Sequence, residues 1–154
     1  MPTGDVNYYN GLGCQNQRAG EYSKAIVYFS KAIELAPNNP DFRFNRGWCC
    51  IKTEQYEMAI SDFTFVLGKN ANDAESFYNR GLSYQRTSDY RNAYNDFSEA
   101  IKINPNEADY YFNRGIVNCG LGDKTNAVQD LETGLRLNPH NEMAKAALSQ
   151  IKQL

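Results

Sequence analysis

Side chains that commonly carry acid–base, nucleophilic or metal chemistry are scarce in this chain of 154 residues. The only histidine, His140, follows a proline and has no visible partners for a catalytic triad or a metal site. The four cysteines are Cys14, Cys49, Cys50 and Cys119, and no two of them form a C-x-x-C motif. No phosphate-binding loop of the G-x-x-x-x-G-K-[ST] type is present. We therefore predict that the protein is not an enzyme and binds no metal or cofactor.

Composition narrows the class of partner. The chain has 16 basic and 18 acidic side chains, so it has no basic field for non-specific binding to nucleic acid or to a membrane surface. No stretch approaches the roughly 18 consecutive apolar residues that a membrane-spanning helix needs. The first residues do not resemble a signal peptide, and adjacent Cys49 and Cys50 would form a strained disulfide. We expect a cytoplasmic protein with reduced thiols that binds neither nucleic acid nor membranes.

A polar pair recurs along the sequence. Each of three arginines is followed sixteen residues later by an aspartate, and the pairs are Arg46 with Asp62, Arg80 with Asp96 and Arg114 with Asp130. The equivalent positions of the first unit hold Leu12 and Tyr28, so charge occurs with charge and an apolar residue with an aromatic one. This pattern predicts a charge-assisted contact between two helices. The alternative is that the arginines hold a carboxylate of a ligand.

These pairs belong to a larger repeat with a period of 34 residues. A glycine column, an alanine column and a column of three phenylalanines and one leucine all keep this step: Gly13, Gly47, Gly81, Gly115; Ala25, Ala59, Ala93, Ala127; Phe29, Phe63, Phe97, Leu131. Each unit has the pattern of two helices joined by a short polar turn. Because glycine inside a helix costs roughly 1 kcal/mol relative to alanine, we predict a close approach at each glycine. The alanines are the expected small partners.

The unit at 74–107, with FYNRG, Tyr90, Ala93, Phe97, Ala100 and Pro105, resembles a tetratricopeptide repeat. On this resemblance the repeats are 6–39, 40–73, 74–107 and 108–141, and 142–154 is a capping helix, all in a single domain over 1–154. The implied fold is all-α: a right-handed superhelical solenoid of antiparallel helix pairs with about nine helices. For the last segment, a docking helix for another chain is the alternative.

The second repeat departs from the family pattern. Arg43 stands where the other repeats have an aromatic residue, Val66 where two have alanine, and Ala71 where the others have proline. We expect a looser or differently angled junction between the second and third repeats.

The resemblance implies a concave wall lined by the first helix of each repeat. Large residues spaced four apart on these helices share one face, so we predict an exposed stripe, with burial in the core as the alternative. The predicted groove residues are Asn10, Phe44, Asn45, Trp48, Tyr78, Asn79, Leu82, Phe112, Asn113 and Ile116.

Three asparagines at the same repeat position, Asn45, Asn79 and Asn113, are similar to the asparagine ladders of peptide-binding tetratricopeptide proteins. An amide offers a donor and an acceptor, so it can bond to both polar groups of an extended backbone. Solvation of the helix face and bonding between repeats are the alternatives. Three such bonds contribute about 0.5–1.5 kcal/mol each, so apolar contacts would have to supply most of the affinity.

The resemblance also allows a comparison with one known class of ligand, the acidic tails of chaperones. The two-carboxylate clamp that holds acidic chaperone tails would fall on five positions of which only Asn45 matches; the others are Asn10, Cys14, Glu75 and Asn79. Chaperone tails are therefore disfavoured. Acidic residues instead follow one rim, at Asp41, Glu75 and Asp109. They are explained either by favourable placement in the first turn of a helix or by a preference for basic peptides.

Two hypotheses follow for function. In the first, the protein is an interaction scaffold that binds an extended peptide segment of a protein partner in its groove. In the second, it is a self-assembling or structural solenoid segment of a larger complex, with homo-oligomers as one form. Substitutions in the groove would remove a partner in the first case, and the size of the assembly would depend on concentration in the second.

Overall fold

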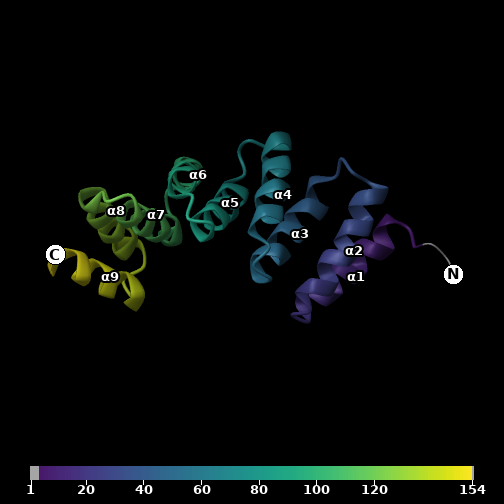
Figure 1. Ribbon diagram of the computed structural model, residues 1–154, viewed down its shortest axis with the longest axis horizontal. Coiled ribbons are helices and arrows are strands. Elements are labelled where there is room, and N and C mark those ends of the chain that lie inside the picture. Colours follow the sequence, from purple (N-terminus) through teal and green to yellow (C-terminus); the bar gives the residue numbers. More distant parts are fainter. Residues whose placement is uncertain (1–3, 154) are drawn as a thin grey trace. The chain divides into compact units, whose positions relative to one another are not determined.

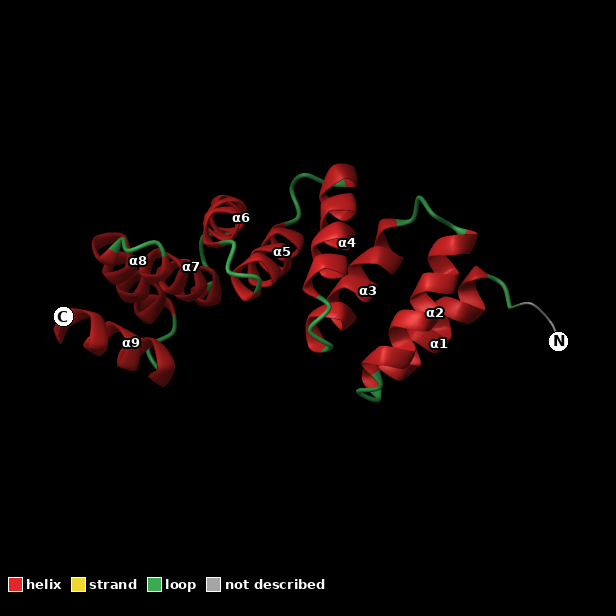
Figure 2. Ribbon diagram, viewed as in Figure 1, coloured by secondary structure: helices red, strands yellow, loops and turns green. Residues whose placement is uncertain are grey.

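The computed structural model describes residues 4–153, and these residues form nine α-helices and no strand (Figure 1). The helices are α1 (Val6–Arg18), α2 (Tyr22–Leu35), α3 (Pro40–Lys52), α4 (Tyr56–Lys69), α5 (Ala74–Arg86), α6 (Tyr90–Ile103), α7 (Ala108–Gly120), α8 (Lys124–Leu137) and α9 (Glu142–Gln153). This confirms the predicted all-α class and the number of helices. Short loops join successive helices (Figure 2).

The chain divides into two compact units, Met1–Ala71 and Asn72–Leu154. In the first unit α1 packs on α2, α2 on α3 and α3 on α4; in the second, the order continues from α5 to α9 in the same way. The division falls two residues before the end of the second repeat, close to the junction that the sequence predicts to be unusual. The angle of that junction stays a prediction.

The turn inside each hairpin has one residue in the left-handed region of backbone space. These residues keep the 34-residue step: Gly20, Glu54, Ser88 and Gly122, with φ of 76°, 60°, 62° and 79°. Glycine adopts this conformation without a steric penalty. The second and third repeats use Glu54 and Ser88 there instead, so the requirement for a tight turn overrides residue preference.

The close approach predicted at the glycine column is present, but its partner is the aromatic column. A Cβ added to Gly13 would lie 2.5 Å from Cε1 of Phe29, and one added to Gly81 would lie 2.8 Å from Cε1 of Phe97. The alanines are fully buried. At Gly115 the carbonyl oxygen of Ala127 is among the three atoms nearest to an added Cβ, at 3.3 Å, whereas at Gly13 and Gly81 all three belong to the phenylalanine ring. The prediction that each glycine mainly contacts an alanine is therefore wrong, because the phenylalanine ring fills the space beside the glycine.

Glycines in α1 allow a matched test. We expect Gly13→Ala to lower the free energy of unfolding by about 1–2 kcal/mol, since overpacking against Phe29 outweighs the gain in helix propensity. Gly11 lies in the same helix with nothing within 4 Å of an added Cβ, so Gly11→Ala should raise stability by up to about 1 kcal/mol. Urea unfolding measures both, and equal effects would contradict the account.

The three arginine–aspartate pairs join the two helices of one repeat. In every pair Nε donates to Oδ2 and Nη2 to Oδ1, at 2.6–2.8 Å. The third donor group of Arg46 reaches Ser30, and that of Arg114 reaches Ser98, in the preceding repeat. This confirms the predicted contact between helices. Since the guanidinium groups already bind protein oxygens, a role in holding a ligand carboxylate has no support.

Burial and pairing act in opposite directions on these groups. The hydrogen bonds that Arg80 donates to Asp96 raise the pKa of Arg80, whereas burial raises the pKa of Asp96 although Arg80 opposes that rise. The carboxylate of Asp96 therefore depends on Arg80 to offset the effect of its burial. Such a pair fixes the register of the two helices more surely than it adds stability.

Removing one partner exposes that dependence. We expect Arg114→Ala to lower the free energy of unfolding by about 2–4 kcal/mol, because the 7% exposed side chain of Asp130 would lose its counter-charge. Lys152→Ala is the control, since its pair with Glu132 is half exposed and should contribute little. A double-mutant cycle with Asp130→Asn, followed by thermal unfolding, would contradict this if the coupling were no larger than that of the exposed pair.

In the second repeat, Arg43 and Arg46 both donate to the carboxylate of Asp62. Its Nη1 lies 3.3 Å from Oδ1 of Asp62, and its guanidinium carbon lies 4.3 Å from the ring centre of Phe65. The arginine is thus held on an aromatic face and beside a buried carboxylate. This explains how the unit accommodates a charged residue in an aromatic column.

All four cysteines are free. Cys49 and Cys50 are fully buried, and burial raises their pKa values to about 11 and about 12. Burial also raises the pKa of Cys119, but this residue is exposed. We expect iodoacetamide to modify Cys119 slowly near pH 8 and to leave Cys49 and Cys50 unmodified, because the buried pair lacks both access and thiolate. Mass spectrometry of native and urea-unfolded protein measures this. Modification of the buried pair at the rate of Cys119 would contradict it.

Candidate functional site

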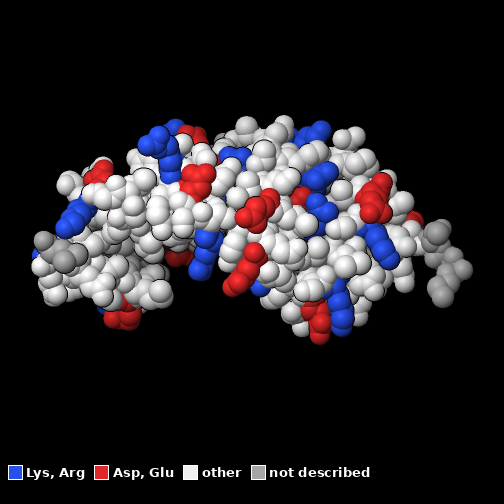
Figure 3. Space-filling view, in the orientation of Figure 1, with Lys and Arg blue, Asp and Glu red and all other residues white. Residues whose placement is uncertain are grey.

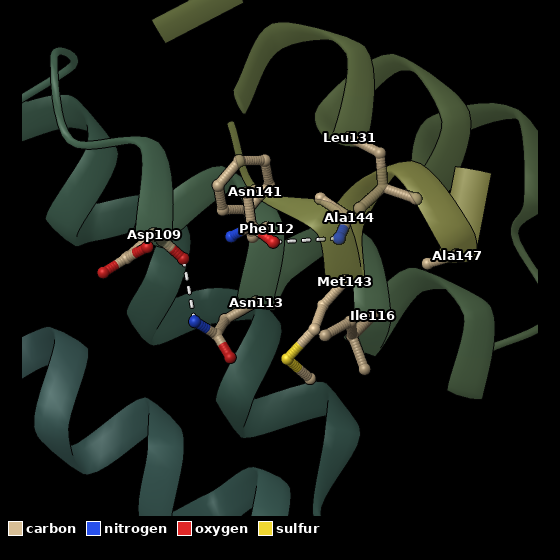
Figure 4. Close-up of a pocket in the computed structure, with 9 residues that line it drawn as sticks. All are labelled: Asp109, Phe112, Asn113, Ile116, Leu131, Asn141, Met143, Ala144 and Ala147. Atoms are coloured by element: carbon tan, nitrogen blue, oxygen red, sulfur yellow. Dashed lines mark hydrogen bonds between the residues drawn. The ribbon is translucent and has the colours of Figure 1, made fainter. Parts of the chain in front are cut away.

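Two adjoining pockets lie on one face of the second unit. The open pocket, of about 610 Å³, is lined by Leu82, Gln85, Arg86, Tyr90, Asn113, Ile116, Gly120 and Met143. The end pocket, of about 290 Å³, is lined by Asp109, Phe112, Asn113, Ile116, Leu131, Asn141, Met143, Ala144 and Ala147 (Figure 4). Asn113, Ile116 and Met143 line both pockets, so the two pockets adjoin, and together they are called the groove.

Helical spacing sets the wall of this groove. Leu82 and Arg86 of α5 are four residues apart, as are Ile116 and Gly120 of α7, so each pair presents the same face. Ile116 is 44% exposed and Met143 of α9 is 82% exposed. Exposed apolar side chains gathered around a groove are typical of interaction sites.

Two residues predicted to lie in the exposed stripe are buried. Phe112 is only 5% exposed, because its ring packs with Leu131 and Ala144 and fits over Gly134, where an added Cβ would lie 2.5 Å from Cε1 of the ring. Its edge still forms part of the end pocket. For Phe112 the alternative of burial in the core is therefore the better description.

Asn79 is the second such residue, with 6% exposure. It shares one face of α5 with Ser76 and Ser83, which are fully buried, since residues three, four and seven apart lie on the same side of a helix. Leu82 neighbours Asn79 on the side of α5 away from Ser76 and Ser83, and it reaches the open pocket. The predicted ladder of exposed asparagines is therefore wrong at Asn79.

Asn113 links two repeats and also faces the groove. Its Nδ2 donates to the carbonyl oxygen of Asp109 at 2.8 Å and to the hydroxyl oxygen of Tyr78 at 3.2 Å. The alternative of bonding between repeats thus holds for the amide nitrogen. Among residues 4–153 no group donates to its Oδ1, so this oxygen is open to a donor from a ligand.

Tyr78 supports the wall from behind. Its ring centre lies 4.9 Å from that of Tyr110 and 5.8 Å from that of Phe97. Burial, and then the charge of Asp109, raise the pKa of Tyr78 to about 12. It is therefore a neutral hydroxyl that positions Asn113.

The predicted groove residues of the first unit lie half-buried against its core. The ring of Phe44 packs edge-on against Phe63, with 5.6 Å between centres. Trp48 packs edge-on against Tyr22, also at 5.6 Å, and carries Nζ of Lys52 4.8 Å from its ring centre. These residues form an aromatic surface rather than a freely projecting stripe.

The polar residues of that surface make few contacts. Asn10 accepts a weak bond from Sγ of Cys14 at 3.9 Å, and Asn45 is half-buried with no hydrogen bond to its side chain among the described residues. The structure therefore leaves the amide of Asn45 available to a ligand.

Carboxylates gather at the N-terminal ends of α5 and α7. The pKa of Tyr110 is raised by burial and then by four surrounding acids, Glu107, Glu75, Asp73 and Asp109. None of the four has an ion-pair partner within the described part of the chain. On the face drawn in Figure 3, acidic and basic side chains are interspersed.

The sequence analysis missed several groove residues, above all Met143. A signal was present, because one more step of 34 residues from Asp109 leads to Met143 in the capping helix. Arg86, four residues beyond Leu82, could have been found by extending the stripe one turn. Tyr90 could not, since it reaches the groove by packing over Gly120, where an added Cβ would lie 2.9 Å from its ring.

No helix within residues 4–153 has the length and apolar character needed to cross a membrane. In the same residues, histidine, cysteine and acidic side chains do not gather in threes as a metal-ion site would require.

Sequence models of the tetratricopeptide repeat match residues 6–39, 28–61, 74–107 and 108–141. The chain belongs to the tetratricopeptide-repeat family. These matches include most of the chain and confirm the resemblance drawn from the glycine, alanine and aromatic columns. No curated protein matches the sequence closely enough to serve as a relative.

Solved structures of tetratricopeptide-repeat proteins share this fold. A MamA protein superposes with a TM-score of 0.91 and 20% identity, over 96% of this chain and 81% of that chain. YrrB, described as a protein with an unusual peptide-binding site, superposes with a TM-score of 0.88 and 23% identity, over 97% of this chain and 75% of that chain. MamA of Desulfovibrio magneticus RS-1 superposes with a TM-score of 0.84 and 22% identity, over 90% of this chain and 78% of that chain. At these identities the similarity establishes the fold alone.

Proposed function

We propose that this tetratricopeptide-repeat protein is an interaction scaffold that binds an extended peptide segment of a partner protein in the groove of its second unit. The observation that carries the proposal is that the open and end pockets adjoin and share Asn113, Ile116 and Met143 as lining residues. Membership of a family of interaction scaffolds supports it. The peptide-binding site described for YrrB, which has a similar fold, is consistent with it.

The dimensions of the groove suit a short segment. Packed helices lie about 8–10 Å apart, and an extended chain rises about 3.3 Å per residue. A peptide that crosses α5, α7 and α9 would therefore contact the wall with about five or six residues. Oδ1 of Asn113 would accept one backbone N–H near the middle of that segment.

Apolar contacts must supply most of the affinity. One net hydrogen bond contributes about 0.5–1.5 kcal/mol, whereas micromolar binding needs about −8 kcal/mol after the cost of association. Leu82, Ile116 and Met143 offer the apolar area for this. Asn113 would set the position of the backbone.

A charge introduced into the groove should remove the partner. We expect Ile116→Glu to abolish retention of partner proteins in an affinity capture from source-cell lysate, because a buried carboxylate without a counter-charge opposes binding. Val27→Glu is the matched control: Val27 is 53% exposed and lies on α2, in the other unit. Quantitative mass spectrometry compares the captured proteins.

Circular dichroism and thermal unfolding should show that both variants stay folded. Equal retention by the wild type and Ile116→Glu would contradict the groove hypothesis. If sedimentation showed instead that the wild type associates with itself in a concentration-dependent way and Ile116→Glu does not, the self-assembling alternative would replace it.

A further inference from the structure

We propose that the end pocket is an anchor site for one bulky apolar side chain of the bound segment, and that this segment carries a lysine or arginine close to that side chain. The inference rests on the proposed function and adds to it the chemistry of the partner. It follows from the lining, the size and the charge of the pocket.

The lining is apolar and combines a packed floor with an exposed rim. Phe112 and Leu131 are buried and belong to one core cluster with Ala144. Ile116 and Met143 form the rim and are exposed to solvent (Figure 4). An apolar side chain entering the pocket would cover this rim without disturbing the floor, as in the central pockets that hold the anchor residues of interfaces.

Two alanines leave the space. Ala144 and Ala147 are three residues apart on α9 and both line the end pocket, so their face of the helix is turned toward it. A larger residue at Ala147 would occupy the same volume. The pocket measures about 290 Å³, at the lower end of the range of about 300–1,000 Å³ for small-molecule sites, which suits a single side chain better than a whole small ligand.

The acidic residues near the end pocket favour a basic residue beside the apolar anchor of the peptide. Asp109 lines the end pocket, and its charge acts on Tyr110 together with those of Asp73, Glu75 and Glu107. The nearest cation of the groove, Arg86, lines the open pocket and not the end pocket. A segment with a basic residue beside its apolar anchor is therefore complementary, and an acidic neighbour would be repelled.

One repeat position changes from acidic to apolar at the C-terminal end of the chain, which explains why the anchor site lies there. The column holds Asp41, Glu75 and Asp109 in the second, third and fourth repeats and Met143 in α9. Where the earlier repeats place a carboxylate, α9 places a flexible thioether side chain that can adapt to different apolar partners. The acidic rim thus ends at an apolar site.

The test begins with the whole chain and a random-peptide phage library. We expect the wild type to select peptides with a large aliphatic or aromatic residue within a few positions of lysine or arginine. A selected peptide, synthesised with fluorescein, then gives dissociation constants by fluorescence anisotropy. Ala147→Phe should weaken binding at least about tenfold by filling the pocket.

Matched variants separate the contributions. Ala146 is the neighbouring alanine, is exposed and does not line the end pocket, so Ala146→Phe should leave the dissociation constant within about twofold. Asp109→Asn should weaken binding about threefold to tenfold and reduce its dependence on salt, because it removes charge without changing shape. Alanine at the anchor position of the peptide should make the wild type and Ala147→Phe bind it equally.

Failure of the inference differs from failure of the proposed function. Peptides that bind Ala147→Phe as tightly as the wild type, but are lost with Leu82→Glu in the open pocket, would overturn the anchor site and leave the groove function intact. Selection of no peptide that depends on either pocket would overturn both. A wild-type dimer in sedimentation that Ala147→Phe dissociates would show that a second copy fills the pocket and would also overturn the anchor site.

Discussion

The contact between a helix glycine and the ring of the facing helix is the constraint on which each hairpin depends. At Gly13 and Gly81 a methyl group would come within 3 Å of a buried phenylalanine, so the two helices can lie this close only where the side chain is a hydrogen atom. The fourth repeat keeps the contact with Leu131 in place of the ring. The fully buried alanines beside the rings follow from the same short separation of the helices.

Once the helices are this close, the arginine–aspartate pairs have a fixed geometry. Each pair spans one hairpin with two parallel bonds, and Ser30 or Ser98 adds a bond from the preceding repeat. A bidentate pair is directional in a way that apolar packing is not. Packing therefore sets the distance between the two helices, and the ion pair sets their rotation and register.

Regular packing leaves the groove face free to vary. In the second unit the residues on that face change from Leu82 to Ile116 and from Asp109 to Met143, while the glycine and alanine columns of the core stay constant. The open and end pockets arise from this variation on a uniform frame. Small residues are again decisive, because Gly120 admits the ring of Tyr90 and Gly134 admits that of Phe112.

The sequence by itself determined the repeat, the helices, the position of the turns and the pairing of arginine with aspartate, because all of these depend on residues at fixed spacings within one hairpin. The resemblance to a tetratricopeptide repeat also placed Leu82, Asn113 and Ile116 on the groove face, and helical periodicity supported this for Leu82 and Ile116. Only the tertiary structure decided that Phe112 and Asn79 are buried and that Asn113 bonds to Tyr78. Periodicity gives the direction of a side chain around its own helix, but exposure depends on how far the neighbouring helices extend over that direction. Met143 and the alanines of α9 form a pocket with α7 for the same reason: the empty volume belongs to neither helix alone.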